Sequence, residues 1–363
     1  MSDQPSMRAA VYHGPGDIRV ESVAVPPSLD GETLVRVLRS GLCGTDVSEW
    51  ASGPHMIPLS YRHPHSDHQG PMIPGHEFIG EVVSTPAGSG LDVGALVASG
   101  AQVFCGECQR CSEGRVNICE RLYTLGLNAN GGHAEFVAAP SRCFVPVPPS
   151  IPLDFAGLAQ PLAVGVHAAR RSRVSAGDSV LISGAGAIGS FVLVALKHMV
   201  PDLTITVTDV DGVKLDRAVR LGASSATTPV SLEADPVFDV TIEASGVPGT
   251  LPYCLERTRS GGTLLCVGLP SRPVELDVHE LVLREITLET TVALVTADDL
   301  PLALTILDQR RAVGEELLDS VRPLEDAPGV LEAMVRGEVH GKVLLDPSPL
   351  AGRDTIPFEA LPG

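Results

Sequence analysis

The sequence predicts an α/β protein, in which a doubly wound parallel sheet is joined to a second, barrel-like β domain. Two observations support this. Short β-like runs punctuated by glycine and proline fill the chain to about residue 158, whereas strands alternate with helical runs after Pro161. In addition, a length of 363 residues exceeds what one hydrophobic core usually organises, so two domains are expected.

The β-like runs of the first part are short and closely spaced. Examples are residues 33–37, 81–83 and 134–137. Strands separated by turn residues at such intervals favour a compact barrel. We therefore expect one domain over residues 1–160.

The second part alternates between strands and helices. The expected strands are 179–183, 203–209, 239–243 and 262–268, and the clearest helices are about 187–199 and 213–221. Such βαβ units predict a parallel sheet covered on both faces, over residues 161–297. From residue 298 to 363 the pattern is helical and then ends in a strand at 341–345, and the tail after Asp346 is expected to be poorly ordered.

Composition and charge limit the possible partners. Hydrophobic residues make up 44% of the chain, and the formal net charge is -18. Nucleic acid and anionic membranes need a basic surface, so neither is an expected partner. The chain lacks a membrane-length apolar run and a signal-peptide pattern. These features predict a cytoplasmic protein that acts on a small, mostly neutral molecule.

A glycine-rich turn follows the strand at 179–183 and opens a helix. Its residues are Gly184-Ala185-Gly186-Ala187-Ile188-Gly189. In a dinucleotide-binding turn, Gly184 would permit the tight bend, Gly186 the approach of a pyrophosphate, and Gly189 close packing of helix on strand. The helix N-terminus at Ala187 and Ile188 would face the phosphates. Alone the motif is weak, because glycine turns are common.

Asp209 strengthens the dinucleotide interpretation. It lies 20 residues past Gly189, at the end of the next strand, where a carboxylate binds ribose hydroxyls. Its charge would repel a 2′-phosphate, so the expected cofactor is NAD rather than NADP. Lys214 is placed to reach the same ribose, but an ordinary solvated helix lysine fits its spacing equally well.

Four cysteines lie within fifteen residues of one another. They are Cys105, Cys108, Cys111 and Cys119, within an expected lobe at about 104–120. This spacing lets one loop surround a tetrahedral zinc and leaves no position for water, which is typical of a structural site. Two further motifs, Cys43-Gly44-Thr45-Asp46 and Gly75-His76-Glu77, each offer one metal ligand in a glycine-framed setting.

Together and in this order, the motifs resemble the zinc-containing medium-chain alcohol and polyol dehydrogenase family, from about Met7 to Leu345. The chain is most similar to the 2,3-butanediol dehydrogenases in its Cys-Gly-Thr-Asp motif, its proline-rich insert before Gly75 and its segments 161–164 and 281–288. The resemblance implies a GroES-like catalytic domain, a Rossmann NAD-binding domain and a C-terminal return to the catalytic domain. It also implies two zinc ions per chain and a homodimer or homotetramer.

The resemblance further implies a catalytic zinc held by Cys43, His76 and Gln160. Polyol-type relatives usually have glutamate at the third position, so Gln160 leaves the centre one charge more positive. We hypothesise stronger Lewis acidity and looser metal retention, with Glu77 able to act as a substitute ligand.

Thr45 occupies the position of the family's proton-relay hydroxyl. Asp46 and Glu77 are expected to orient and tune the ligands. Some relatives have a histidine as the outer end of the relay, where this chain has Ser48.

Other histidines and cysteines are expected to be structural. His55, His63, His65 and His68 lie in the insert and fit a solvated loop at the mouth of a cleft. Structural roles are also expected for His133 and His167, and burial in the core for Cys143, Cys254 and Cys266.

The predicted activity is transfer of a hydride between NAD and a secondary alcohol, vicinal diol or polyol. The alternatives within this class are sugars, aminocyclitols, specialised biosynthetic alcohols and, more distantly, threonine. A C=C or C=N reductase with an idle catalytic zinc, or a non-enzymatic NAD-binding protein, would keep the glycine turn and the cysteine lobe. Neither would need Cys43, Thr45 and His76 together.

Overall fold

The computed structural model describes residues 5–232 and 237–348, and the chain divides into two compact units. The first unit comprises residues 1–160, 295–308 and 318–363, and the second comprises residues 161–294 and 309–317. The expectation of a poorly ordered tail falls mainly on residues 349–363, which lie outside the described residues.

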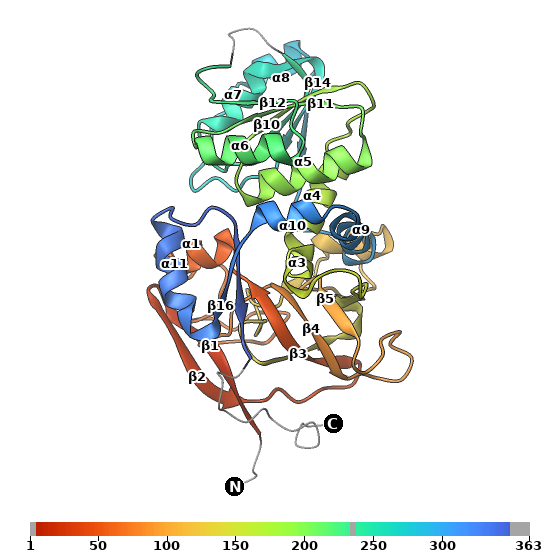
Figure 1. Ribbon diagram of the computed structural model, residues 1–363, viewed down its shortest axis with the longest axis vertical. Coiled ribbons are helices and arrows are strands. Elements are labelled where there is room, and N and C mark those ends of the chain that lie inside the picture. The colour runs from red at the N-terminus through yellow and green to blue at the C-terminus, as the bar shows by residue number, and fades with distance from the viewer. Residues whose placement is uncertain (1–4, 233–236, 349–363) are drawn as a thin grey trace. The chain divides into compact units, whose positions relative to one another are not determined.

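A seven-stranded sheet organises the first unit (Figure 1). Its path is β16-β17-β3-β4-β5-β9, and β8 pairs with β3 away from this path. The strands of this unit, including two separate two-stranded sheets, are β1 (Ser6–Gly14), β2 (Asp17–Ala24), β3 (Glu32–Gly41), β4 (Glu77–Ser84), β5 (Leu96–Ser99), β6 (Gln102–Val103), β7 (Tyr123–Thr124), β8 (Phe136–Pro140), β9 (Phe144–Pro146), β16 (Leu318–Pro323) and β17 (Lys342–Asp346).

The helices of the first unit are mostly short. They are α1 (Gly44–Ser52), α2 (Gln109–Ser112), α3 (Leu153–Ala156), α9 (Thr296–Gln309) and α11 (Ala327–Val335), with 3-10 turns at Val116–Ile118, Ser141–Cys143 and Leu324–Asp326. Three buried apolar clusters form the core, and one of them joins Tyr12 and Leu42 to Leu331 of α11. The C-terminal segment is therefore part of the same core as the first strands.

The second unit is a parallel sheet of six strands in the order β12-β11-β10-β13-β14-β15. This is the strand order of a doubly wound nucleotide-binding sheet, with its switch point between β10 and β13. The strands are β10 (Ser179–Ser183), β11 (Thr204–Thr208), β12 (Ser225–Thr227), β13 (Phe238–Glu243), β14 (Thr258–Cys266) and β15 (Thr287–Thr290).

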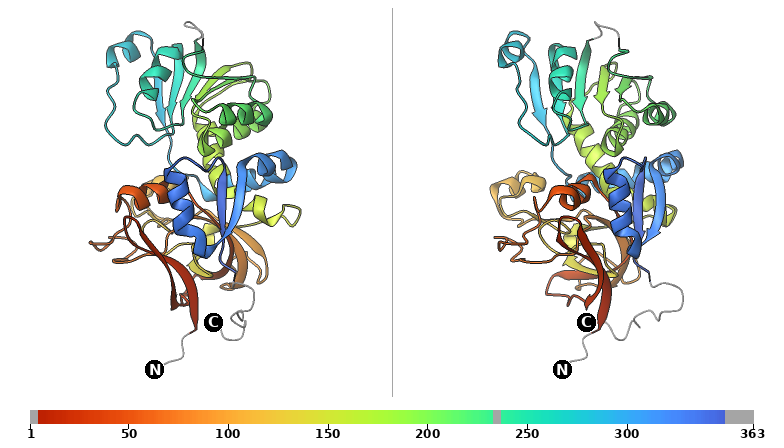
Figure 2. Two further views of the ribbon diagram at one scale, coloured as in Figure 1. Left: turned by 60° about the vertical axis from the view of Figure 1, so that its left-hand side comes forward. Right: turned by 90° about the vertical axis from the view of Figure 1, so that its left-hand side faces the viewer.

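Helices lie on both faces of this sheet, with α5 and α6 on one side and α7 on the other (Figure 2). The helices of the second unit are α4 (Ala159–Arg171), which begins at the unit boundary, α5 (Ala187–Met199), α6 (Gly212–Leu221), α7 (Thr250–Arg257), α8 (Val278–Leu283) and α10 (Arg311–Leu317). Residues 189–196 of α5 are all buried, because this helix packs against α6 and α10 as well as against β10. The predicted α/β class is confirmed.

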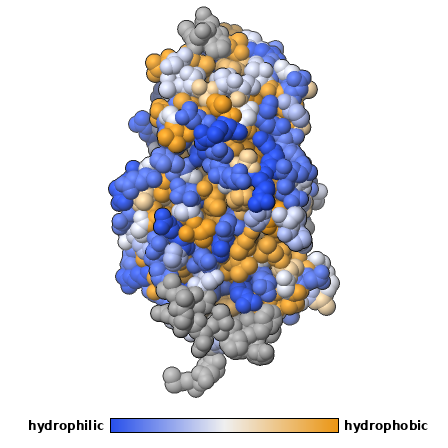
Figure 3. All heavy atoms as spheres, viewed as in Figure 1, coloured by the Kyte–Doolittle hydropathy of each residue, from blue (hydrophilic) through white to orange (hydrophobic). Residues whose placement is uncertain are grey.

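None of the helices in the described ranges is long and apolar enough to cross a membrane. Hydrophilic and hydrophobic residues are interspersed on the face drawn in Figure 3. This distribution is ordinary for a protein surface, much of which consists of apolar atoms even in well-packed proteins.

Candidate active site

Pairing of β3 with β4 brings the two ligand motifs of the first unit together. Gly41, near the end of β3, is opposite Glu77, which begins β4. Cys43 then follows β3 as the N-cap of α1, and His76 immediately precedes β4. Two segments that lie more than thirty residues apart in sequence therefore present their side chains side by side.

Cys43, His76 and Glu77 form one cluster, with one ligand atom from each lying within 4.8 Å of the others. His76 is 7% exposed and Glu77 is 2% exposed. The Cys43 backbone N–H donates to Asp46 Oδ2 at 2.8 Å, which fixes the first turn of α1. Although burial alone lowers the pKa of His76, the negative charges of Cys43, Asp46 and Glu77 raise it to about 9. The cluster therefore attracts positive charge.

Glu77 is paired with a residue that the sequence analysis missed. Its Oε2 forms an ion pair with Lys342 Nζ, which also donates to the Leu42 carbonyl at 2.8 Å. Lys342 begins β17 and is 4% exposed. Burial alone lowers the pKa of Lys342, but Glu77 and Cys43 outweigh that effect, so its pKa lies above the ordinary value. A charged residue directly before the apolar run at 343–345 was the available sequence signal.

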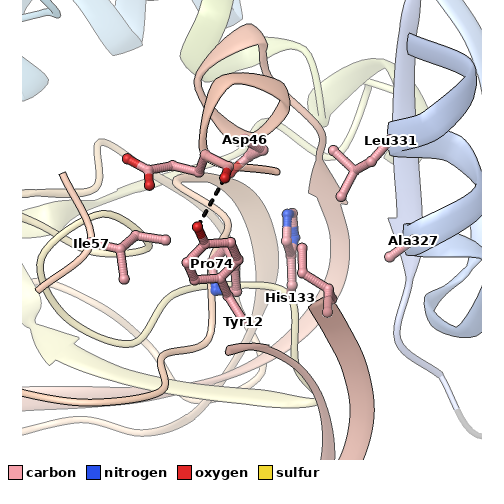
Figure 4. A pocket seen from close by; sticks show the side chains of 9 residues that line it. Tyr12, Asp46, Ile57, Pro74, His133, Ala327 and Leu331 are labelled. Atoms are coloured by element: carbon pink, nitrogen blue, oxygen red, sulfur yellow. Dashed lines mark hydrogen bonds between the residues drawn. The ribbon is translucent and has the colours of Figure 1, made fainter. Parts of the chain in front are cut away.

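A cavity of about 10 Å³ in the same unit is lined by Asp46, Tyr12 and His133 among others (Figure 4). His133 is 1% exposed, and its Nδ1 is 2.8 Å from Ser40 Oγ. A Cβ at Gly75 would lie 2.5 Å from His133 Nδ1, so the glycine permits this close approach to the loop before His76. These contacts support the structural role that was expected for His133.

The other predicted members of this site lie on two helices. Thr45 is half-buried in the first turn of α1, and Ser48 is exposed, with its hydroxyl donating to the Gly44 carbonyl. Gln160 is 8% exposed and is the second residue of α4.

The four lobe cysteines form a second cluster, with their sulfur atoms within 4.8 Å of one another. Backbone N–H groups point at these sulfurs: Cys105 donates to Cys119 Sγ at 3.3 Å, and Cys108 donates to Cys105 Sγ at 3.4 Å. Hydrogen bonds from the backbone of Glu107 and Cys108 lower the pKa of Cys105 to about 6. Such bonds favour the thiolate form that binds metal.

Both clusters fit zinc by their chemistry. Four closely spaced thiols can fill all four positions around a tetrahedral zinc, which suits a closed structural site. The cluster of Cys43 and His76 offers fewer than four His, Cys and carboxylate ligands, which suits an open site. His76 Nδ1 and Asp46 Oδ1 are buried without a hydrogen-bond partner. The Nδ1 of His76 is therefore available to a carboxylate that would orient the ring.

The glycine turn of the second unit is closely packed at two of its three glycines. Gly184 has φ +107°, and a Cβ at Gly189 would lie 1.8 Å from the Gly184 carbonyl oxygen. A Cβ at Gly186, the N-cap of α5, would meet nothing within 4 Å. Ala187 and Ile188 form the first turn of α5. The turn is therefore tight on its protein side and open at the helix N-terminus, where an anion binds.

Asp209 follows β11 directly and holds this turn. Its Oδ2 accepts the Ala185 N–H at 2.7 Å, and its Oδ1 accepts the Asp211 N–H at 3.0 Å. Arg217 of α6, which sequence reasoning did not single out, is 5% exposed and donates to the Ala185 carbonyl at 3.0 Å. Lys214 Nζ lies 3.6 Å from Asp211 Oδ2 in an ion pair within the helix.

The insert histidines do not gather into a metal site. His55 and His65 are exposed, and His63 and His68 are half-buried. No group of three or more metal-binding side chains within the described ranges includes any of them. Cys143 and Cys254 are fully buried as expected, whereas Cys266 is only half-buried, because it ends β14 beside a cavity that Glu243 and Thr290 also line.

Comparison with known proteins agrees with the fold and the two clusters. The family profile "Alcohol dehydrogenase GroES-like domain" matches residues 29–149, and "Zinc-binding dehydrogenase" matches residues 187–309. L-threonine 3-dehydrogenase of Burkholderia thailandensis is 30% identical over 76% of this chain and 80% of its own length. Sorbitol dehydrogenase of Bacillus subtilis is 32% identical over 74% of this chain and 76% of its own length.

A solved structure extends the likeness to almost the whole chain. The crystal structure of 2R,3R-butanediol dehydrogenase from Bacillus subtilis has a TM-score of 0.85 and 27% identity, and the match covers 94% of this chain and all of that one. The fold and the two clusters define a zinc- and nicotinamide-dependent oxidoreductase that acts on CH–OH groups. The chain belongs to the zinc-binding alcohol dehydrogenase family, as the sequence analysis predicted.

Proposed function

We propose that this protein oxidises secondary alcohols with NAD, and that vicinal diols and related polyols are its preferred substrates. The observation that carries the proposal is the Cys43–His76 cluster, in a chain that also has an open glycine turn next to Asp209. The names of the similar proteins, which act on sorbitol, butanediol and threonine, support a substrate with neighbouring polar groups.

Each residue has a defined task in this proposal. Cys43, His76 and Gln160 would hold the catalytic zinc, and Cys105, Cys108, Cys111 and Cys119 the structural one. A bound zinc supplies Lewis acidity at the alcohol oxygen, and a bound nicotinamide supplies the hydride acceptor. Thr45 Oγ1 would be the first acceptor of the substrate's hydroxyl proton. The Asp46 carboxylate keeps Cys43 in place by accepting the hydrogen bond of the Cys43 backbone N–H.

The cofactor would bind along the turn from Gly184 to Gly189, with its pyrophosphate at the open N-terminus of α5. Asp209 would accept hydrogen bonds from the ribose hydroxyls. Lys214 is a weaker candidate for the same ribose because Asp211 already pairs with it.

A substrate panel tests the proposal. NADH formation should be followed with 2,3-butanediol stereoisomers, sorbitol and other polyols, cyclitols and L-threonine, each also with NADP. The highest kcat/KM is expected for a vicinal diol or polyol with NAD. Preference for L-threonine, for a cyclitol or for NADP would replace this proposal with the corresponding alternative, and reduction of a C=C or C=N bond alone would contradict it.

Replacing Gln160 by glutamate is expected to slow the loss of the catalytic zinc to a chelator roughly tenfold or more, because a carboxylate adds a full charge to the metal bond. The same change should lower kcat roughly threefold, since a less positive centre polarises the alcohol less. Zinc counted by mass spectrometry gives the first result, and the lobe zinc is the reference within each sample. Unchanged zinc retention and unchanged kcat would together refute the role given to Gln160.

We further propose a cytoplasmic homodimer or homotetramer. All eight cysteines are unpaired, which suits a reducing compartment. β15 is an edge strand of the six-stranded sheet (Figure 2), and Leu288 on it is exposed together with Val278 and Val282 of α8. An unpaired sheet edge with exposed apolar side chains is usually covered, and a second copy of the chain would cover it symmetrically. Light scattering of the purified protein would measure the assembly.

A further inference from the structure

Lys342 is an unusual residue for this chain. The sequence has 23 arginines but only three lysines, at positions 197, 214 and 342. Lys342 is 4% exposed, and burying an ammonium group is costly unless it is paired. Its partners therefore show why a lysine is present at this position.

Those partners adjoin both expected zinc ligands of the first unit. Lys342 Nζ donates to the carbonyl of Leu42, the residue before Cys43, at 2.8 Å. The same ammonium pairs with Oε2 of Glu77, the residue after His76. One side chain from the last strand thus connects the two segments that carry the ligands.

Glu77 itself lies close to metal-binding distance. Its Oε1 is 4.0 Å from His76 Nε2. Two nitrogen or oxygen ligands of one tetrahedral zinc lie about 3.4 Å apart, given bonds of about 2.0–2.1 Å. The carboxylate therefore needs only a small shift to become a ligand. Its other oxygen, held by Lys342, opposes that shift.

We propose that Lys342 is a positioning residue that keeps Glu77 off the catalytic zinc and so keeps the substrate's coordination position open. The inference rests on the proposed function, because it assumes a catalytic metal at Cys43 and His76.

The charges around the site show why such a restraint is needed. Cys43, Asp46 and Glu77 are three acidic groups, and Lys342 pairs with Glu77 alone, so Cys43 and Asp46 remain for a divalent ion to neutralise. Gln160 brings no charge of its own. An unrestrained Glu77 would thus be the strongest additional ligand within reach, and by coordinating it would occupy the substrate's place.

The test compares Lys342→Met with the double variant Lys342→Met/Glu77→Gln, both in the full-length protein. In the single variant Glu77 is released, and zinc loss to a chelator is expected to slow about tenfold or more, within the range that residues behind the ligands usually control. Activity should fall by a similar factor. Cobalt substituted at this site should show shifted visible absorption bands, because an oxygen ligand has been added.

The double variant removes the charge of Glu77 along with that of Lys342. The rate of zinc loss should then return to within about threefold of that of the unaltered protein, and the cobalt bands to their original positions, since neutral replacements of buried ion pairs are often tolerated. Lys197→Met is the matched control, because Lys197 also donates to a backbone carbonyl, in its case those of Pro201 and Leu203, but neither acceptor is next to an expected zinc ligand in the sequence. Its zinc loss should be unchanged.

Faster or unchanged zinc loss in Lys342→Met, or a double variant as impaired as the single one, would overturn the proposal. If Lys342→Met does not fold, the double variant still decides: retention of the catalytic zinc supports the proposal, and its loss shows that Glu77 is a true ligand. Zinc loss and cobalt bands require no substrate. A failed role for Lys342 is therefore distinguishable from a failed assignment of the enzyme's activity.

Discussion

Alanine in place of Cys43 is expected to lower alcohol-dependent NADH formation by at least about 10³-fold, because a Lewis acid supplies several kcal/mol of transition-state stabilisation. The thiol joins His76 and Glu77 in a cluster whose ligand atoms lie within 4.8 Å, and none of the other described His, Cys, Asp or Glu side chains belongs to that cluster. Zinc content should fall from about two ions per chain to about one, since the lobe remains intact.

Cys143→Ala is the matched control for this experiment. Cys143 is a fully buried thiol of the same unit, and its Sγ donates to the Gln102 carbonyl at 3.3 Å. The control should keep both zinc ions and most of its activity. A Cys43→Ala protein that retains two zinc ions, or more than a few per cent of the activity, would contradict the assignment of the catalytic centre.

Asparagine in place of Asp209 is expected to weaken the preference for NAD over NADP. A hydrogen bond to a charged group contributes about 1.5–3 kcal/mol, so kcat/KM for NAD should fall roughly 10- to 100-fold. NADP should improve at the same time, because the repulsion of its 2′-phosphate is removed. Asparagine keeps an oxygen that can accept the Ala185 N–H, so the glycine turn should remain folded.

Asp211→Asn provides the comparison for Asp209. Asp211 caps α6 by accepting the Val213 N–H at 2.9 Å, and asparagine caps helices about as well as aspartate. Its ratio of kcat/KM for the two cofactors should remain that of the unaltered protein. If both variants shift the ratio equally, general surface charge rather than the Asp209 carboxylate selects the cofactor.

The sequence predicted those parts of the fold that local patterns encode. Strands β10, β11, β13 and β14 are apolar runs bounded by turns, and the structure has them within a few residues of the expected limits. β12 and β15 were not expected. β12 is only three residues long, and β15 carries exposed threonines and leucine at an edge, so neither has the buried pattern of a central strand.

The candidate sites also contain parts that local sequence patterns predict and parts that they do not. The lobe cysteines and the glycine turn are contiguous motifs, and their geometry follows from spacing alone. The contacts of Lys342 with Leu42 and of Arg217 with Ala185 connect residues 300 and 32 positions apart. Such contacts depend on strand register and helix packing, which no local periodicity specifies. Sequence reasoning therefore singled out the candidate ligands but not the side chains that contact the residues next to them.

The late position of β17 has a consequence for how the protein is made. Chains emerge from the ribosome N-terminus first, and domains generally fold as units. All strands of the second unit lie between residues 179 and 290, so that sheet has its whole sequence before β16 and β17 are synthesised. The sheet of the first unit needs both late strands, and Glu77 has no Lys342 until then. The Glu77–Lys342 pair beside the candidate metal centre can therefore form only after the strands of the nucleotide-binding sheet have been synthesised, although Cys43 and His76 are translated first.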